Sequence, residues 1–380
     1  MLLKTDELLE QARSRTGLNK FGEDSFREPL ARLVDSINRE CQPTEMGAMV
    51  IPEMLIGQLA VRLEVEDWYK RHPEIDEVQI VAPLFTASLP RTGTTALGFI
   101  LWQDPNTRVL RQWEAYHPCP PPEAATADTD PRIALAQQES DGLESMVPKL
   151  AKLLPRAVTG PHECFVIKSY AFCSYGYDAL LHVPTYIDWF VHSREAQLIG
   201  YRYHRRVLKL LQWHCPPNRW SLRTPEHLFA MDVIDEIYPD AQFIMTHRDP
   251  VKVLPSVCSL IYELRRAHVT NPEPGEDGKR QQEYWALALE RAMEFRDRIG
   301  ESRFFDIAHR RQVANPAEQI PLLYKKLGWE YDDAMTERIL RWQETYPKRD
   351  HSVPPEFFGL DPEEIRKRYQ TYSERFAQFL

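Results

Sequence analysis

The segment "FTASLPRTGTTALGFIL", residues 85–101, combines the patterns of a strand, a short loop and an apolar helix. It overlaps the apolar run "VQIVAPLFTAS" (78–88), which predicts a strand of a parallel sheet that is buried on both faces. A second apolar run, "AQFIMTH" (241–247), is also followed by a loop and a helical pattern. Repeated strand, loop and helix units predict an α/β fold, in which ligands bind at the carboxyl ends of the strands.

The first of these loops is suited to an anion. Free backbone N–H groups at a helix start point to one place, and the helix dipole adds partial positive charge there. In "LPRTGTT", Gly93 allows close approach of a ligand, Arg91 adds a permanent charge, and hydroxyl donors come from Thr92, Thr94 and Thr95. The lysine of a nucleoside triphosphate P-loop is missing, which disfavours a Mg·ATP enzyme. The loop therefore predicts a phosphate or sulfate site.

Two motifs resemble those of sulfotransferases that use 3′-phosphoadenosine 5′-phosphosulfate (PAPS). In that family the sequence P-[KR]-[ST]-G-T-T follows the first strand, and "PRTGTT" (90–95) matches it at every position. An arginine and a serine eight residues later hold the 3′-phosphate of the nucleotide, and these positions correspond to Arg248 and Ser256 in "FIMTHRDPVKVLPSVCSL" (243–260). A guanidinium and a hydroxyl together suit a dianionic phosphate. The resemblance extends over nearly the whole chain.

The resemblance is closest to a bacterial branch of the family and implies both a fold and a reaction. The implied fold is a P-loop-like three-layer α/β domain with a central parallel sheet over 78–380, preceded by a helical extension over 1–77. The implied reaction moves the sulfuryl group from PAPS to a hydroxyl or phenol of a small-molecule acceptor, with no metal, and releases 3′-phosphoadenosine 5′-phosphate (PAP). Arg91 is expected beside the leaving oxygen, and Arg349 or His351 over the nucleotide. A kinase with a degenerate phosphate loop and a non-catalytic PAP binder stay open as alternatives.

The acceptor needs a general base within hydrogen-bond reach, and three side chains are candidates. Glu114 in "LRQWEAYHP" lies where a glutamate base follows the loop in some relatives of the resembled family. His227 in "SLRTPEHLF" lies near the catalytic histidine of the cytosolic members, with Arg223 in the place of a lysine. Glu163 in "GPHECF" is the third. Each also has a structural alternative, such as an ion pair of Glu114 with Arg111.

Composition excludes several classes of function. The chain of 380 residues has 43% hydrophobic residues, enough for a large core, and its net charge of −9 offers no field for nucleic acid or anionic lipid. Its six cysteines include no C-x-x-C pair, which argues against a structural zinc site and predicts reduced, mostly buried thiols. We find no stretch of ~20 apolar residues and no signal-peptide pattern, so we expect a cytoplasmic protein without membrane contact.

Other segments carry weaker signals. Residues 1–75 predict helices that pack on the core, with a homodimer interface or a substrate lid as the alternative. The aromatic-rich segment 164–190 predicts core packing, or else a pocket for an apolar or aromatic acceptor. Two segments rich in proline, 117–131 and 271–280, are expected to be mobile loops.

Overall fold

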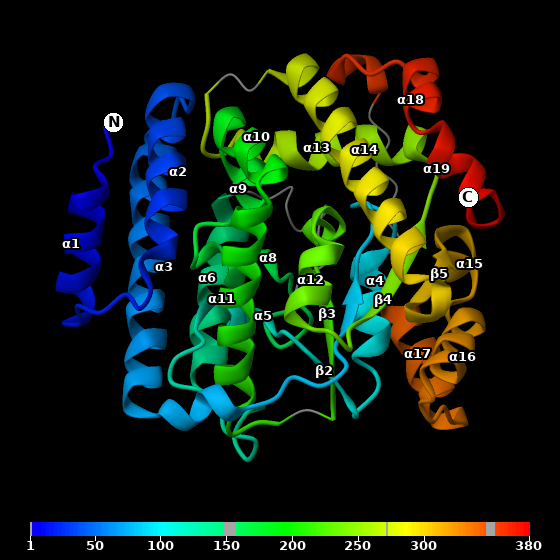
Figure 1. Cartoon of the computed structure of the whole chain (residues 1–380), viewed down its shortest axis with the longest axis horizontal. Coiled ribbons are helices and arrows are strands. Elements are labelled where there is room, and N and C mark those ends of the chain that lie inside the picture. Colours follow the sequence, from blue (N-terminus) through cyan, green and yellow to red (C-terminus); the bar gives the residue numbers. More distant parts are fainter. Residues whose placement is uncertain (1, 147–156, 217, 271–272, 347–353) are drawn as a thin grey trace.

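Five parallel strands form the centre of the molecule in the computed structural model, which describes residues 2–146, 157–216, 218–270, 273–346 and 354–380 (Figure 1). The strands are β1 (Leu84–Thr86), β2 (Thr107–Val109), β3 (Arg219–Arg223), β4 (Gln242–His247) and β5 (Phe304–Ala308). Their order in the sheet is β2-β3-β1-β4-β5. Phe85 of β1 lies opposite Leu222 of β3 and Phe243 of β4. The predicted α/β fold with a parallel sheet is confirmed.

The first strand is much shorter than the run 78–88 predicts. β1 has three residues and begins only at Leu84, because the residue before it, Pro83, has no N–H to donate to a neighbouring strand. The Pro83 carbonyl still accepts a hydrogen bond from the Gln242 backbone, at 3.0 Å. The second predicted strand is correct to within one residue, since β4 begins at Gln242.

Helices cover both faces of the sheet. One face carries α4 (Thr94–Leu101), α16 (Pro316–Leu327) and α17 (Asp333–Thr345). The other carries α11 (Arg194–Gln212), α12 (Met231–Ile237) and α14 (Pro274–Ile299). Side chains alternate along each strand, so Leu84 and Ile244 pack on the first set, whereas Phe85 and Phe243 pack on the second. This arrangement is the three-layer fold that the resemblance implies.

The N-terminal region is a layer of helices beside the sheet domain (Figure 1, blue). Its elements are α1 (Thr5–Thr16), the 3₁₀ turn η1 (Asp24–Phe26), α2 (Arg27–Glu40), α3 (Glu45–Arg71) and η2 (Pro73–Glu77). Their buried apolar side chains, such as Leu30 and Leu59, belong to one continuous core with Phe85 of the sheet. The predicted helical extension is therefore present, while the domain boundary at residues 77 and 78 stays a prediction.

Helix α3 corrects one expectation from the sequence. Over its 27 residues, α3 has the length and composition that a membrane span requires, with a mean hydropathy of 1.3 over its most apolar window. Of that window, 44% is buried inside the molecule. Among the described residues, α3 is the one helix with the length and hydropathy of a membrane span. The expectation that no stretch is long and apolar enough is therefore wrong.

The remaining elements connect these layers. The helices are α5 (Gln112–Tyr116), α6 (Arg132–Met146), α8 (Phe165–Ser169), α9 (Gly176–Leu180), α10 (Pro184–His192), α13 (Pro250–Arg265), α15 (His309–Ala314), α18 (Pro362–Arg368) and α19 (Gln370–Arg375). The short turns are η3 (Pro225–Phe229), η4 (Glu301–Arg303), η5 (Pro355–Phe358) and η6 (Ala377–Phe379). Because α14 begins at Pro274, most of the segment 271–280 is helix and not the predicted loop.

Two further expectations can be compared with the structure. All six cysteines are free, and four of them are buried: Cys41, Cys164, Cys173 and Cys258. In the aromatic-rich segment 164–190 most rings are buried in the core, including Phe172 and Tyr186. Phe165 at its start is only partly buried. Core packing therefore explains most of this segment.

Candidate active site

The loop between β1 and α4 is a tight turn. Arg91 has a φ of 64° and Gly93 a φ of 90°, so two of three successive residues adopt the left-handed conformation. A Cβ atom at Gly93 would lie 3.0 Å from His309 Cδ2, which adds a steric reason for glycine. Helix α4 begins at Thr94, directly after Gly93, so its first free N–H groups belong to this turn. The backbone is built as the predicted anion site requires.

The threonines of this loop have different roles. The Thr92 hydroxyl donates to the Leu89 carbonyl at 2.6 Å and lies 2.6 Å from the Thr246 hydroxyl, and Thr92 is fully buried. This hydroxyl stabilises the turn itself, which differs from its predicted role as a ligand donor. The Thr95 hydroxyl accepts a hydrogen bond from Arg223 Nη1 at 3.3 Å. Thr95 therefore links the start of α4 to the end of β3.

The second loop places its residues against the first. Arg248 follows the last residue of β4, and Asp249 caps α13 by accepting a hydrogen bond from the Val251 backbone at 2.9 Å. Arg248 Nη1 donates to the Arg91 carbonyl at 2.8 Å. Arg91 Nε in turn donates to Ser256 Oγ at 3.0 Å, on a helix that continues through its internal proline. The structure thus brings together three residues that lie up to 165 positions apart in sequence.

The contact with Ser256 shows which way the Arg91 side chain points. Its guanidinium lies beside the residue expected to hold a 3′-phosphate, whereas the sequence places it beside the leaving oxygen. Its role at the leaving oxygen therefore stays a prediction. Arg349 and His351, expected to close over the nucleotide, lie outside the described residues.

Helix α15 contributes two residues that sequence reasoning missed. Gln312 Nε2 donates to the Gly93 carbonyl at 3.1 Å, and Gln312 Oε1 is buried without a hydrogen-bond partner among the described residues. His309 lies against Gly93, and burial together with the charge of Arg248 lowers its pKa to about 4, so it is neutral at neutral pH. A third unit of strand and helix, "RFFDIAHRRQV" (303–313), is the signal that points to them.

Glu163 is the base candidate whose surroundings favour proton transfer. Its Oε1 accepts from Arg223 Nη1 at 3.0 Å, and its side chain is 24% exposed. Burial raises the pKa of Glu163, and the nearby charge of Arg223 opposes this rise. Because the same Nη1 atom also reaches Thr95, one guanidinium connects this carboxylate to the first turn of α4.

Glu114 has a different environment. Its carboxylate is fully buried, with Arg108 Nη2 at 2.7 Å and Arg111 Nη2 at 2.9 Å from Oε1. Its Oε2 accepts from the Arg111 backbone at 3.2 Å and so caps α5. Burial alone would raise the pKa of Glu114, but the two guanidinium charges outweigh it and lower the pKa. This arrangement is the predicted structural alternative, and it argues against Glu114 as the base.

His227 lies in the core. Its ring is fully buried, with Nδ1 at 2.6 Å from the Tyr201 hydroxyl and the ring edge-to-face with Phe85 at 4.9 Å. Burial, reinforced by His204 and Lys168, lowers the pKa of His227 well below its ordinary value. Contact with an acceptor would require this ring to leave the core, which argues against His227 as the base.

Comparison with known proteins shows to which family the chain belongs. Residues 83–333, more than half of the chain, match the model of the sulfotransferase family. The chain belongs to this family. The sulfotransferase resembles the solved structure of sulfotransferase STF9 from Mycobacterium avium, with a TM-score of 0.91, 28% identity, and coverage of 98% of this chain and 96% of that one.

A second solved structure and one curated relative extend the comparison. Sulfotransferase STF1 from Mycobacterium tuberculosis H37Rv has a TM-score of 0.86 and 29% identity, covering 97% of this sulfotransferase and 99% of that chain. The curated relative is omega-hydroxy-beta-dihydromenaquinone-9 sulfotransferase Stf3 of Mycobacterium bovis, 33% identical over 109 residues. That match spans 28% of this chain and 28% of the relative.

The contact between α15 and the loop leads to a prediction. Gln312→Met keeps the volume of the side chain and removes the donor to the Gly93 carbonyl. A hydrogen bond contributes about 0.5–1.5 kcal/mol net, so we expect PAP to bind roughly twofold to tenfold more weakly by calorimetry. Gln319→Met is the matched control, because Gln319 is also buried but bonds the Ala308 backbone and not the loop. Unchanged PAP affinity in a folded Gln312→Met variant would contradict the prediction.

Proposed function

We propose that this sulfotransferase moves the sulfuryl group of PAPS to a hydroxyl or phenol of a small-molecule acceptor and releases PAP. The observation that carries the proposal is the convergence of Arg91, Arg248 and Ser256 beside the start of α4. A guanidinium and a hydroxyl suit the dianionic 3′-phosphate, and the free N–H groups of α4 suit a second anion. This combination supports a nucleotide that carries negative charge at both ends.

The surroundings of the loop also fit such a nucleotide. PAPS, when bound, supplies an activated sulfuryl group. Gly93 leaves room where a side chain would collide with His309, and the unpartnered Gln312 Oε1 is an acceptor that a bound ligand can satisfy. Among the described residues, His, Cys, Asp and Glu side chains form no group of three that could hold a metal ion. Positive charge at this site comes from arginines.

Within this proposal Glu163 accepts the proton of the acceptor hydroxyl. A general base must be ionised and reachable, and Glu163 combines partial exposure with a raised pKa. Arg223, which contacts both Glu163 and Thr95, stabilises negative charge at the start of α4 as the acceptor oxygen attacks. A guanidinium does not give up a proton readily, so Arg223 and Arg91 act as charges and donors.

The acceptor in this proposal is an apolar molecule with a free hydroxyl. Aromatic rings gather around His162, the residue before Glu163: the centroid of the His162 ring lies 5.4 Å from that of Tyr116 and 6.1 Å from that of Phe165. Tyr116 is 41% exposed, so this wall reaches the surface. Apolar and aromatic walls with a few polar groups are typical of small-molecule pockets. The name of the curated relative, an omega-hydroxy menaquinone sulfotransferase, supports the same class of acceptor.

The test compares nucleotides by calorimetry and then screens acceptors with PAPS. We expect PAP to bind about 10 to 100 times more tightly than AMP, because hydrogen bonds between charged groups contribute about 1.5–3 kcal/mol. Arg248→Ala should remove most of this difference. Apolar alcohols and phenols should then be sulfated.

Each alternative has its own outcome. Equal binding of PAP and AMP would reject the roles of Arg248 and Ser256. Tight PAP binding without turnover of any alcohol or phenol would favour a non-catalytic binder. Mg²⁺-dependent binding of ATP would favour a kinase.

A further inference from the structure

The C-terminal segment packs on the strand end that carries Arg248. η6 contacts β5, and α19 precedes it at the C-terminal end of the chain (Figure 1, red). The ring of His247, the last residue of β4, stacks on Phe376 at 4.3 Å and on Phe379 at 5.3 Å between centroids. His247 is buried and directly precedes Arg248. The end of the chain therefore covers the backbone from which the Arg248 side chain leaves.

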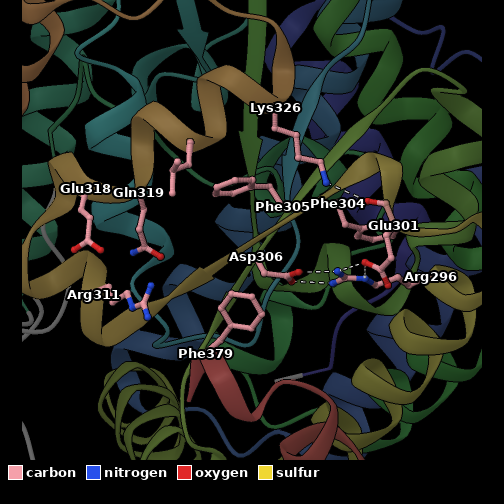
Figure 2. A pocket seen from close by; sticks show the side chains of 11 residues that line it. Arg296, Glu301, Phe304, Phe305, Asp306, Arg311, Glu318, Gln319, Lys326 and Phe379 are labelled. Atoms are coloured by element: carbon pink, nitrogen blue, oxygen red, sulfur yellow. Dashed lines mark hydrogen bonds and ion pairs between the residues drawn. The ribbon is translucent and has the colours of Figure 1, made fainter.

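His247 also joins two hydrogen-bond partners from different elements. Its Nε2 lies 2.7 Å from Asp306 Oδ1 of β5, and its Nδ1 lies 3.0 Å from the Tyr372 hydroxyl of α19. Arg296 donates to both Asp306 oxygens, at 2.8 Å and 2.6 Å, beside Phe379 (Figure 2). Burial alone would raise the pKa of Asp306, but Arg296 and His247 hold it at about 2. Asp306 is therefore an acceptor, and His247 Nε2 carries the proton.

This tautomer sets the direction of the remaining bonds. With the proton on Nε2, His247 Nδ1 is an acceptor, so the Tyr372 hydroxyl donates to it. Burial raises the pKa of Tyr372, so its hydroxyl keeps the proton that it donates to His247. Tyr372 is buried, and its hydroxyl thus donates to the residue directly before Arg248. A directed series of hydrogen bonds runs from Tyr372 through His247 to Asp306.

We propose that Tyr372 is a positioning residue for the 3′-phosphate site, because it holds the ring of His247 and thereby the strand end from which the Arg248 side chain leaves. The proposal rests on the proposed function, since it takes Arg248 as the group that binds the 3′-phosphate. Arg248 Nη1 reaches the Arg91 carbonyl at 2.8 Å, so a shift of the Arg248 backbone also moves its contact with the first loop. Discrimination between nucleotides with and without a 3′-phosphate then depends on the C-terminal segment.

The test is Tyr372→Phe in the full chain, which removes the hydroxyl and keeps the ring. Tyr369→Phe is the matched control, because Tyr369 is equally buried but its hydroxyl donates to the Gln282 carbonyl at 2.7 Å. We expect Tyr372→Phe to weaken PAP binding roughly threefold to tenfold by calorimetry, and AMP binding less than about twofold. With PAPS, KM should rise while kcat changes little. Tyr369→Phe should leave both affinities unchanged.

The outcomes separate this proposal from the proposed function. A wild-type chain that binds PAP and AMP equally would overturn both. If Tyr372→Phe prefers PAP over AMP as strongly as the wild type does, the positioning role alone is overturned. An equal loss of affinity for the two nucleotides would also overturn it. If Tyr372→Phe does not fold, His247→Phe keeps an aromatic ring against Phe376 and removes the acceptor, and it must give the same selective loss.

Discussion

Glu163→Gln is expected to lower turnover with PAPS and an apolar phenol roughly 10²-fold to 10⁴-fold, the usual contribution of a general base. The amide keeps the shape of the side chain and its contact with Arg223 but cannot accept the proton. PAP affinity should change little, because the proposed 3′-phosphate contacts come from Arg248 and Ser256. Steady-state kinetics and PAP calorimetry on the same preparations measure the two effects.

The pH dependence of kcat/KM is a second test of Glu163 as the base. Burial raises the pKa of Glu163, so its protonated form persists to higher pH than in an ordinary glutamate. A base is active when ionised, and kcat/KM of the wild type should therefore fall as the pH drops through this raised pKa. The residual activity of Glu163→Gln should lack that acid limb. A limb that survives the substitution would assign the base to another group.

Glu114→Gln is expected to lower the stability of the folded protein. Arg108 and Arg111 keep 11% of their side-chain surface exposed, and the substitution leaves both beside a neutral amide. Removing one partner of a buried ion pair costs about 3–5 kcal/mol, so the free energy of unfolding in denaturant should fall by about that amount. Asp128→Asn is the matched control: Asp128 also pairs with Arg111, at 2.9 Å, but is 96% exposed. Its loss should cost less than about 1 kcal/mol.

Together the two glutamate variants decide the base. If Glu114→Gln folds with normal stability and loses turnover as strongly as predicted for Glu163→Gln, the assignment is reversed. If both variants keep full turnover, the base is neither glutamate, and the buried His227 would have to become accessible during turnover.

The local features of both loops could be predicted from sequence because neighbouring residues determine them. Glycine at a left-handed position, aspartate at a helix start and an apolar run before each loop are read within a few residues. The length of β1 was not predictable in this way, since strand pairing depends on donors supplied by other strands. Pro83 explains the shortened strand once its neighbours are known.

The base was harder to identify because its environment comes from distant residues. In sequence Glu114 and Glu163 look alike, but two guanidinium charges outweigh burial and lower the pKa of Glu114, whereas burial outweighs Arg223 and raises the pKa of Glu163. Glu163 is joined to Arg223, 60 positions away. Gln312 contacts Gly93 across 219 positions, so the strand and helix pattern at 303–313 does not show which residue it contacts. Such contacts are set by the topology of the sheet.

The strand order has a consequence for how enzymes of this design diversify. β1 lies between β3, which ends at Arg223, and β4, which leads into Arg248. In the proposed function, the β3 side of the central strand carries the acceptor chemistry, and the β4 side carries the residues that bind the nucleotide. Substitutions around Glu163 and Phe165 can change which acceptors are bound while the residues that bind the nucleotide stay the same. New acceptor specificities can thus evolve on one side of β1 without changes on the other side.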